Sequence, residues 1–299
     1  MSVIKSYDVG NGDMFCILHN SDNFTTIDCN LVDDRVDELI DEVRHLSRSK
    51  TITRFISTHP DEDHIHGLET LDESIGILNF YRVDNRVAKS VETSSFKRYK
   101  ELRGDPMRSF AIFKGCKRRW MNQSDGDRGS SGLNILWPDT SNSDYKSALS
   151  IAANGGSCNN VSPIIKYSLQ DGVVALWMGD LETGFMEKVV DCVDLSHADI
   201  LFAPHHGRRS GRPPRAWLEK ISPGVIVVGD APSDDLYYYR GYNTITQNSS
   251  GDILFDCGTG KVDVFVSSAT YDASFLHYDT HGSYDGMRYV GSFATRDGS

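Results

Sequence analysis

A short apolar run followed at once by a dense group of polar side chains constrains this chain more than any other feature. Residues 54–56 are typical of the end of a buried strand, and the apolar residues between Leu68 and Leu71 begin a helix. The polar residues between them therefore lie on a strand-to-helix loop, where side chains can converge on one point. The alternative is a solvated acidic turn, but no core position requires two imidazoles and three carboxylates in six residues, as found here (His59, Asp61, Glu62, Asp63, His64).

The rest of the chain repeats this strand, polar turn and helix order in both halves. Two such halves, with no Gly/Pro-rich linker between them, predict a single α/β domain in which two sheets pack face to face with helices outside. Helices are predicted near 36–46, 92–102 and 182–190 and after Pro213-Pro214. Strands are predicted at 3–9, 14–18, 24–27, 53–57, 75–83, 133–137, 162–169, 173–178, 198–203, 225–228, 252–255 and 262–266.

Three segments do not follow this order of strand, polar turn and helix. A basic insertion at about 84–131 contains a window, residues 96–120, with a net charge of +7, which leaves −18 for the remainder of a chain whose total is −11. The stretch that follows strand 133–137, up to Ser157, reads as polar and mobile. The segment of about 268–299 reads as a polar, solvated tail. The net charge argues against a protein that coats nucleic acid over its whole surface.

Targeting signals and cysteine usage predict a cytoplasmic protein that does not enter the membrane. No stretch is apolar for long enough to span a bilayer, and the first residues, MSVIKSYD, do not form a signal peptide. The six cysteines lie far apart with no CxxC pair, which is typical of free, buried thiols.

Polar residues follow three predicted strands at their carboxyl ends, and together they indicate a metal site. The loop with His59 to His64 follows strand 53–57, Asp180 follows strand 173–178, and His205 and His206 follow strand 198–203. Loops at that edge of an α/β layer commonly carry active sites. Imidazole nitrogens with carboxylate oxygens suit Zn²⁺, Mn²⁺ or Fe²⁺, and paired metals activate water for hydrolysis.

These motifs resemble a known superfamily. The run Thr58-His59-x-Asp61-x-Asp63-His64-x-x-Gly67 is similar to the metal-binding signature of the metallo-β-lactamase superfamily, in the variant with Asp in place of the second His. Residues 178–182 (MGDLE), 198–207 (ADILFAPHHG), 9–13 (VGNGD) and 26–28 (TID) resemble its other motifs. Together they are most similar to the ComEC-type hydrolase domain of bacterial DNA-uptake proteins, here free-standing, over about residues 3–265 without the insertion. The resemblance implies an αββα four-layer sandwich.

The resemblance also implies a ligand set for two divalent metal ions. His59 and Asp61 would hold one ion, and Asp63 and His64 would hold the other. Asp63 would also be the partner of the attacking water.

The later motifs would complete the second site. Asp180 would bridge the ions, and His205, or its neighbour His206, would be the last ligand. The catalytic residues implied are Asp63, His64 and Asp180.

One ligand of the wider superfamily is missing. Many members supply a His between the first motif and the bridging Asp, whereas this chain has Cys158-Asn159-Asn160-Val161-Ser162. Asn159 or Asn160 would serve there as a neutral ligand or contact a substrate phosphate. With oxygen donors in place of two imidazoles, the site favours Mn²⁺ over Zn²⁺.

Other polar residues are assigned supporting roles. Asp13 and Asp28 are interpreted as carboxylates that orient the ligands or stabilise the fold. Arg208 and Arg209 follow the His-His-Gly motif and would contact an anionic substrate, unless they form a solvated basic turn. The resemblance adds Ser210 and Thr246 as phosphate contacts.

The leading hypothesis for function is a metal-dependent phosphodiesterase, most specifically a nuclease acting on DNA or RNA. Aromatic residues interleave with the cations of the basic window, as in proteins that bind single strands, although they also fit the apolar face of the insertion. The first alternative is hydrolysis of a cyclic nucleotide or signalling oligonucleotide, with a pocket lined by Tyr237–Tyr239 and Tyr242. A β-lactam or lactone hydrolase is disfavoured by Asp61. The alternative outside the enzymes is a metal-binding interaction module that has a protein partner in a multiprotein system and no turnover of its own.

Overall fold

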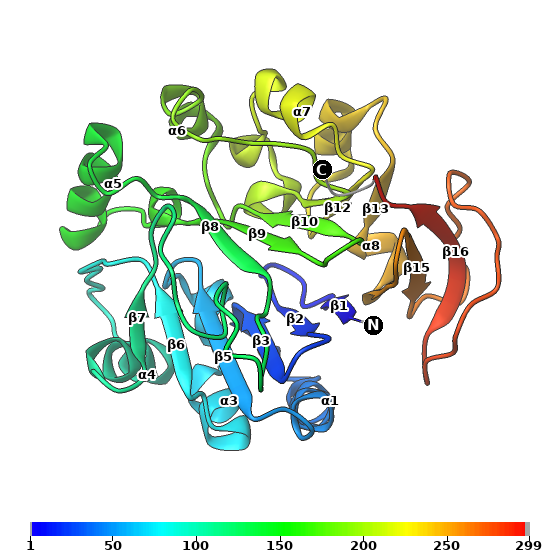
Figure 1. Cartoon of the computed structure of the whole chain (residues 1–299). Helices are drawn as coiled ribbons and strands as arrows, with labels where there is room; N and C mark the ends of the chain where they lie inside the picture. The colour runs from blue at the N-terminus through cyan, green and yellow to red at the C-terminus, as the bar shows by residue number, and fades with distance from the viewer. Residues whose placement is uncertain (1, 297–299) are drawn as a thin grey trace.

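The computed structural model describes residues 2–296 and shows a mixed α/β fold built on two mixed sheets (Figure 1). The larger sheet has the order β16-β15-β14-β1-β2-β3-β5-β6-β7. The strands β3, β5, β6 and β7 run parallel, and the remaining neighbours are antiparallel. Its strands are β1 (Ser2–Ser6), β2 (Phe15–Leu18), β3 (Asn23–Ile27), β5 (Ile52–Ser57), β6 (Asn79–Arg82), β7 (Ser109–Ala111), β14 (Ile253–Cys257), β15 (Lys261–Val266) and β16 (Arg288–Ala294).

The smaller sheet has the order β13-β12-β11-β10-β9-β8. Here β10 to β13 are parallel, and β8 and β9 are antiparallel to their neighbours. Its strands are β8 (Leu133–Trp137), β9 (Ile164–Ser168), β10 (Val174–Trp177), β11 (Ile200–Phe202), β12 (Val225–Val228) and β13 (Thr244–Thr246). Strands such as β11 and β12 are apolar without alternation because both of their faces are buried.

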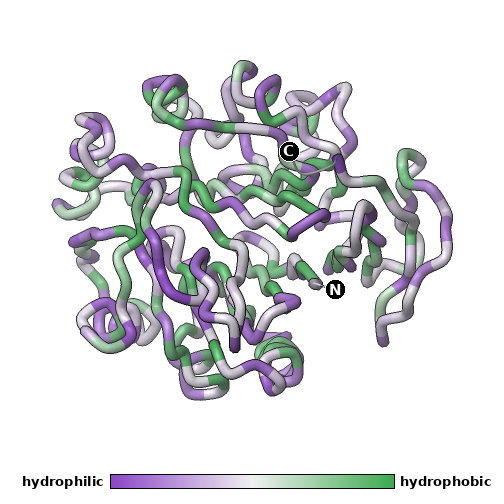
Figure 2. The backbone as a smooth tube through the Cα atoms, viewed as in Figure 1, coloured by the Kyte–Doolittle hydropathy of each residue, from purple (hydrophilic) through white to green (hydrophobic). Residues whose placement is uncertain are grey.

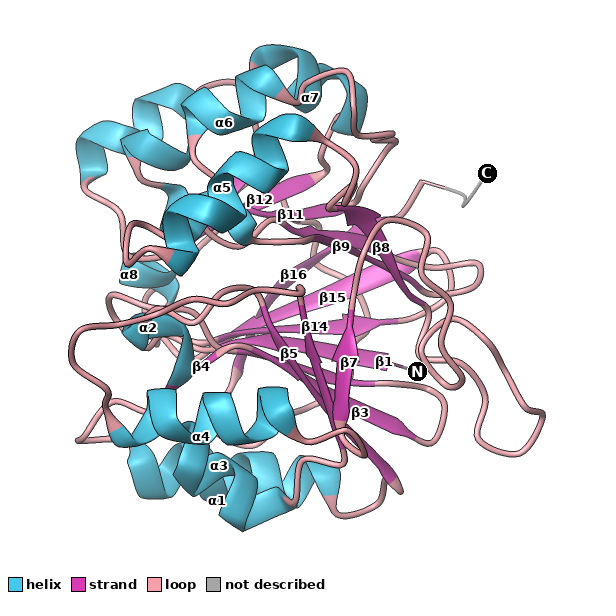
Figure 3. Ribbon diagram, turned by 90° about the vertical axis from the view of Figure 1, so that its left-hand side faces the viewer, coloured by secondary structure: helices cyan, strands magenta, loops and turns pink. Residues whose placement is uncertain are grey.

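Helices cover the outer face of each sheet, which confirms the predicted two sheets with helices outside (Figure 3). The larger sheet is covered by α1 (Val36–Ser47), α3 (Leu68–Ile75) and α4 (Ser94–Gly104), and the smaller by α5 (Ser143–Ala153), α6 (Thr183–Lys188) and α7 (Arg215–Ile221). The shorter elements are β4 (Cys29–Asn30), α2 (Glu62–Ile65) and α8 (Gln247–Ser250), with single 3₁₀ turns η1 (Asn159–Val161), η2 (Pro204–Gly207), η3 (Arg209–Gly211) and η4 (Ser233–Tyr239). Within residues 2–296, no helix has both the length and the apolar character needed to cross a bilayer.

The two sheets meet through a group of large aromatic side chains. Phe15 of β2 packs edge-on against Phe202 of β11, with ring centroids 4.8 Å apart, and Trp177 of β10 stacks on Phe202 at 4.6 Å. Phe255 of β14 closes the group from the larger sheet. Hydrophobic colouring accordingly concentrates in the strands between the helical layers (Figure 2). This burial holds both sheets in one core, so loops from the two sheets can share one site.

Two predictions of secondary structure were incomplete, one of a mobile stretch and one of a strand. The stretch before Ser157, expected to be mobile, contains α5, where Asn142 accepts a hydrogen bond from the backbone N–H of Tyr145 and so caps the helix. Its buried positions are Tyr145, Ala148 and Ala152. Because two of these three are alanines among polar residues, the helical periodicity of hydrophobic residues is weak in the sequence. The predicted strand 75–83 is shorter, because Ile75 ends α3 and Gly76, with φ of 63°, terminates that helix.

The C-terminal segment is also more structured than expected. Residues 288–294 form β16, which pairs antiparallel with β15 and buries Tyr289 and Val290. The expected tail of about 268–299 therefore extends the larger sheet, although its residues 297–299 lie outside the described residues. The sequence pattern of residues 288–294 did not predict a strand, because β16 forms by pairing with the edge of β15.

The basic insertion joins the larger sheet at its other edge. Its helix α4 buries Phe96, Tyr99 and Leu102, and β7 pairs with β6. Two of the aromatic residues considered for base stacking, Phe96 and Tyr99, therefore belong to the core, while Phe113 is exposed.

Candidate metal centre

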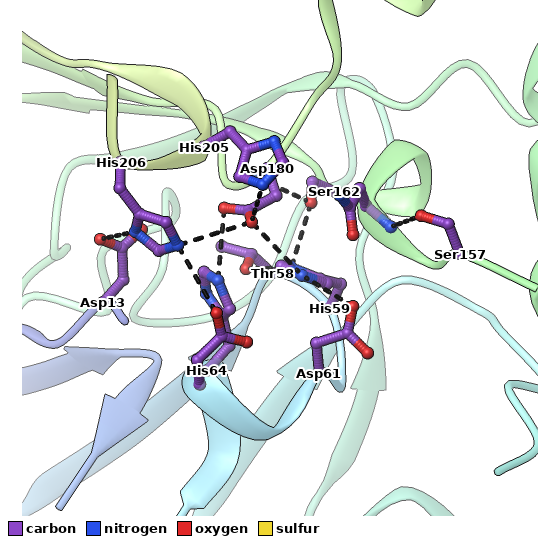
Figure 4. A network of polar contacts seen from close by, with 12 residues as sticks. Asp13, Thr58, His59, Asp61, His64, Ser157, Ser162, Asp180, His205 and His206 are labelled. Atoms are coloured by element: carbon purple, nitrogen blue, oxygen red, sulfur yellow. Dashed lines mark hydrogen bonds and ion pairs between the residues drawn. The ribbon is translucent and has the colours of Figure 1, made fainter. Parts of the chain in front are cut away.

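Loops from both sheets bring the predicted polar residues to one point (Figure 4). His59 and His64 follow β5, Asp180 follows β10, and His206 follows β11. All four side chains are buried. The predicted convergence at the carboxyl ends of parallel strands therefore occurs, and it occurs between the two sheets.

Asp180 lies at the middle of this group. Its Oδ1 is 3.3 Å from His64 Nε2, and its Oδ2 is 3.6 Å from His206 Nε2 and 3.9 Å from His59 Nε2. His205 Nε2 approaches the same Oδ2 to 3.5 Å. Asp180 thus faces four imidazoles through its two carboxylate oxygens.

The donor atoms form two clusters, one of which contains Asp180. In one, donor atoms of Asp13, His64, Asp180 and His206 lie within 4.8 Å of one another. In the other, the same limit holds for His59, Asp61 and Cys158. Since metal–ligand bonds to nitrogen and oxygen are about 2.0–2.2 Å long, donors around one ion lie up to roughly 4 Å apart, and both clusters are close to that size.

Four buried donor atoms at this point have no hydrogen-bond partner of good geometry among residues 2–296: His59 Nε2, His64 Nε2, His206 Nε2 and Asp180 Oδ1. Leaving a buried polar atom without a partner costs about 1–3 kcal/mol. Four such atoms facing one another fit a site that is completed by cations.

The opposite nitrogens of two of these imidazoles are held by carboxylates. His64 Nδ1 lies 2.9 Å from Asp28 Oδ2, and His206 Nδ1 lies 3.1 Å from Asp13 Oδ1. An imidazole that donates from Nδ1 to a carboxylate presents the lone pair of Nε2 in the opposite direction, toward Asp180. Asp13 and Asp28 are thus placed behind two candidate ligands, where they orient the rings.

Asp28 and Ser162 also shape the surrounding backbone. Asp28 accepts hydrogen bonds from the backbone N–H and the hydroxyl of Thr58. Ser162 Oγ accepts from the backbone N–H of Asp180 and lies 3.3 Å from His59 Nδ1. A Cβ at Gly179, where φ is 50°, would lie 2.7 Å from Ser162 Oγ, so only glycine allows this approach.

Strained backbone marks the loop after β11. His205 and His206 have φ of 51° and 57°, in the left-handed region that non-glycine residues rarely adopt. Asp28 has φ of 52°. Such strain persists only where surrounding structure enforces it, and it clusters at functional sites. Here it turns the two consecutive imidazoles so that both reach Asp180.

The charges of the carboxylates and imidazoles are strongly coupled. Burial lowers the pKa of His59 to about 4. Burial also opposes the charge of His206, but Asp13, Asp63 and Asp180 outweigh it and raise its pKa to about 10. For Asp63, burial raises the pKa, yet His206 and His64 outweigh it and hold it at about 2. The carboxylates therefore attract positive charge to this point, and divalent cations would supply that charge when the imidazole protons leave.

Two other predicted ligands, Asp63 and His205, are more exposed than the buried residues of the group. Asp63 Oδ2 lies 3.7 Å from His206 Nε2, and its side chain is about one-third exposed, so it borders the site at the entrance. His205 is less buried than His206, and its Nδ1 is 3.0 Å from Ser210 Oγ. Of the two histidines, His206 is the better placed to complete the cluster with His64.

The side-chain amide of Asn160 is engaged by Glu182 and is not free to act as the expected ligand. Asn160 donates to Glu182 Oε2 and accepts from the backbone N–H of Glu182, which fixes the start of α6. Asn159 begins η1, and its backbone N–H bonds to Ser157 Oγ. The preceding residue, Cys158, places its thiol within 4.8 Å of donor atoms of His59 and Asp61. In the sequence, the only signal for an unusual ligand was that residues 158–162 contain no His.

The residues expected to bind substrate lie beside the metal cluster. Arg208, Arg209 and Ser210 line a cavity of about 730 Å³, together with Asp230, Ala231, Pro232, Ser233, Asp235 and Asn248. Through Ser210 and His205 the cavity adjoins Asp180. Thr246 ends β13 and is not a lining residue of this cavity.

The two arginines differ in how far they are already paired. Arg208 bonds to the carbonyl of Asp230 and lies 3.7 Å from its carboxylate. The Arg209 guanidinium has no carboxylate within ion-pair distance in the described part of the chain, and its side chain is exposed. Arg209 is thus available to an anionic ligand.

Comparison with known proteins leaves the chemistry to be inferred from this geometry. No protein-family model matches the chain, and no curated protein is significantly similar to it.

Proposed function

We propose that this chain is a metal-dependent phosphodiester hydrolase of the metallo-β-lactamase type, most similar to the ComEC-type hydrolase domain, and that it acts on DNA or RNA. The order of the motifs and the four layers of helices and sheets support this assignment. The observation that carries it is the group of four buried, unpartnered donor atoms between the two sheets.

The residues present fit two divalent ions, Mn²⁺ or Zn²⁺. His59 and Asp61 would hold one, His64, Asp63 and His206 the other, with Asp180 shared between them. Ions held in this way supply Lewis-acid chemistry, which activates water and neutralises charge on phosphoryl oxygens. Asp13 and Asp28 keep the imidazoles of His206 and His64 in the required orientation.

Residues around the centre would orient substrate and water. Asp63, at the entrance, would accept a hydrogen bond from the attacking water at Oδ2. Arg209 would bind a phosphate oxygen of the substrate and stabilise the charge that develops there. Ser210 positions His205 and lines the cavity where that phosphate would enter.

A small nucleotide is the second candidate substrate, and the cavity favours it. Its volume of about 730 Å³ falls in the range of about 300–1,000 Å³ that small-molecule pockets occupy. A cyclic nucleotide or short signalling oligonucleotide would present its phosphate to the same arginines. Of the tyrosines considered for a base, Tyr239 is buried and Tyr237 is exposed.

The test is turnover by the purified full chain with Mn²⁺ or Zn²⁺ on single-stranded DNA, RNA and cyclic dinucleotides. We expect metal-dependent cleavage that is lost in His64→Ala. The matched control is His197→Ala, because His197 pairs with Asp199 at 3.1 Å, as His64 pairs with Asp28, but lies outside the centre. Equal turnover by wild type and His64→Ala would contradict the proposal. Metal binding with no turnover on any substrate would favour an interaction module.

A further inference from the structure

Cys158 occupies the position where the first metal cluster lacks a ligand. It follows α5 and precedes η1, and it is 2% exposed. Its thiol shares a cluster with His59 and Asp61 in which the donor atoms lie within 4.8 Å of one another. Cys158 is the one cysteine of residues 2–296 that lies in such a group, although the six are all free.

A second observation, the environment of His59, points to a ligand at this position. His59 Nε2 is buried, has no hydrogen-bond partner of good geometry within the described chain, and points toward Asp61 Oδ2 at 3.7 Å. Its other nitrogen, Nδ1, is already held by the hydroxyls of Thr58 and Ser162. The ring is therefore fixed with its lone pair directed at the space between Asp61, Asp180 and the thiol.

Asp61 is turned toward the same space by Lys89. The ammonium of Lys89 binds Asp61 Oδ1 at 2.9 Å, which leaves Oδ2 to face His59. The donors grouped here are one nitrogen from His59, one oxygen from Asp61 and the sulfur of Cys158, and Asp180 Oδ2 lies 3.9 Å from the same His59 nitrogen. A donor set that includes a thiolate is typical of Zn²⁺, whereas Mn²⁺ prefers oxygen donors.

We propose that the Cys158 thiolate is a ligand of the first metal ion and that it makes this position selective for thiophilic metals such as Zn²⁺ and Co²⁺ over Mn²⁺. The inference rests on the metal centre of the proposed function and specifies the chemistry of one half of it. Asn159 and Asn160 are then positioning residues of the neighbouring turn.

Cobalt substitution of the purified full chain tests this directly. Co²⁺ bound to a thiolate gives an intense near-ultraviolet charge-transfer band, whereas Co²⁺ bound only to nitrogen and oxygen gives weaker visible bands. We expect the wild type to show the near-ultraviolet band. Cys158→Ser should lose that band and lower the preference for Zn²⁺ over Mn²⁺ at least about 10-fold in competition dialysis.

Two further variants make the result specific. Cys116→Ser removes another buried cysteine, outside both clusters, and should leave the band unchanged. Cys158→His should restore tight binding of the first ion without the sulfur band, even if the serine variant is poorly folded.

The outcomes separate the two proposals. Cobalt binding and phosphodiester turnover without a charge-transfer band in the wild type, or a band that persists in Cys158→Ser, would overturn the role of Cys158 and leave the hydrolase proposal standing. A chain that binds no Co²⁺, Zn²⁺ or Mn²⁺ would overturn both.

Discussion

The candidate metal centre and the basic segment 97–119 are both conspicuous in the sequence because of their charge, but their charged groups are paired to different extents in the structure. Around Asp180, four donor atoms are buried without partners of good geometry among residues 2–296. In the basic segment, by contrast, Arg98, Lys100, Arg108 and Arg119 each pair with nearby carboxylates. Charge density alone therefore does not identify a functional site. What distinguishes the two regions is whether the charged groups are satisfied within the fold.

The pairing reduces, but does not remove, the cationic character of the basic segment. Lys97, Lys117 and Arg118 have no carboxylate within ion-pair distance in the described part of the chain. Arg118 instead lies over the ring of Phe110. The nucleic-acid hypothesis for this segment thus depends on a few free cations, whereas the metal proposal depends on two groups of converging donors.

The largest expected effect comes from the shared carboxylate of the cluster. Asp180→Asn removes a negative charge that faces four imidazoles, so metal content and phosphodiester turnover should both fall by more than about 100-fold, beyond the loss typical of supporting residues. Metal analysis of the purified variant and initial rates would measure this, with far-ultraviolet circular dichroism as the control for folding. Unchanged metal content would show that the unpartnered donors do not form a metal site.

A smaller effect is expected from the carboxylate behind His64. Asp28→Asn weakens the hydrogen bond that orients this imidazole, and we expect metal affinity to fall about 10–100-fold. Asp199→Asn is the matched control, since Asp199 is also buried and also pairs with a histidine, outside the cluster. Equal losses in the two variants would indicate a general effect on folding and would remove Asp28 from the site.

The basic segment is probed by reversing its least paired cations. Replacing Lys97, Lys117 and Arg118 with Glu should weaken binding of single-stranded DNA and reduce the slope of log affinity against log salt by up to about 2, because each neutralised phosphate contributes about 0.7. Turnover of a cyclic dinucleotide should not change. The salt dependence measured by fluorescence anisotropy tests this, and an unaltered slope would exclude the segment from nucleic-acid binding.

The smallest effect is expected where the cation is already paired. Arg98 lies between Asp72, Glu73 and Glu101, so Arg98→Ala should leave the salt slope for DNA unchanged. It should lower the free energy of unfolding by about 1 kcal/mol or less, as for other surface ion pairs. Urea unfolding and the same anisotropy assay would measure both. A change in slope as large as that of the triple variant would contradict the contrast between free and paired cations.

Much of the fold was predictable because its signals are local. Apolar runs ending in polar turns located β5, β10 and β11, and the helical spacing of Leu39, Ile40 and Val43 located α1. The identity of the polar residues after each strand was sufficient to predict that His59, His64 and Asp180 converge. Among the elements that were missed are α5 and β16, which are determined by small residues or by an edge partner rather than by local periodicity.

The sequence by itself determined which donor types this chain offers and at which strand ends they lie. Only the tertiary structure decided which atoms face one another. The left-handed backbone at His206 and its contact with Asp13 direct Nε2 inward, and the turn after α5 places Cys158 beside His59 and Asp61. The physical reason is that side-chain direction depends on backbone dihedral angles and on packing between two sheets, and these are set by contacts between residues far apart in the chain.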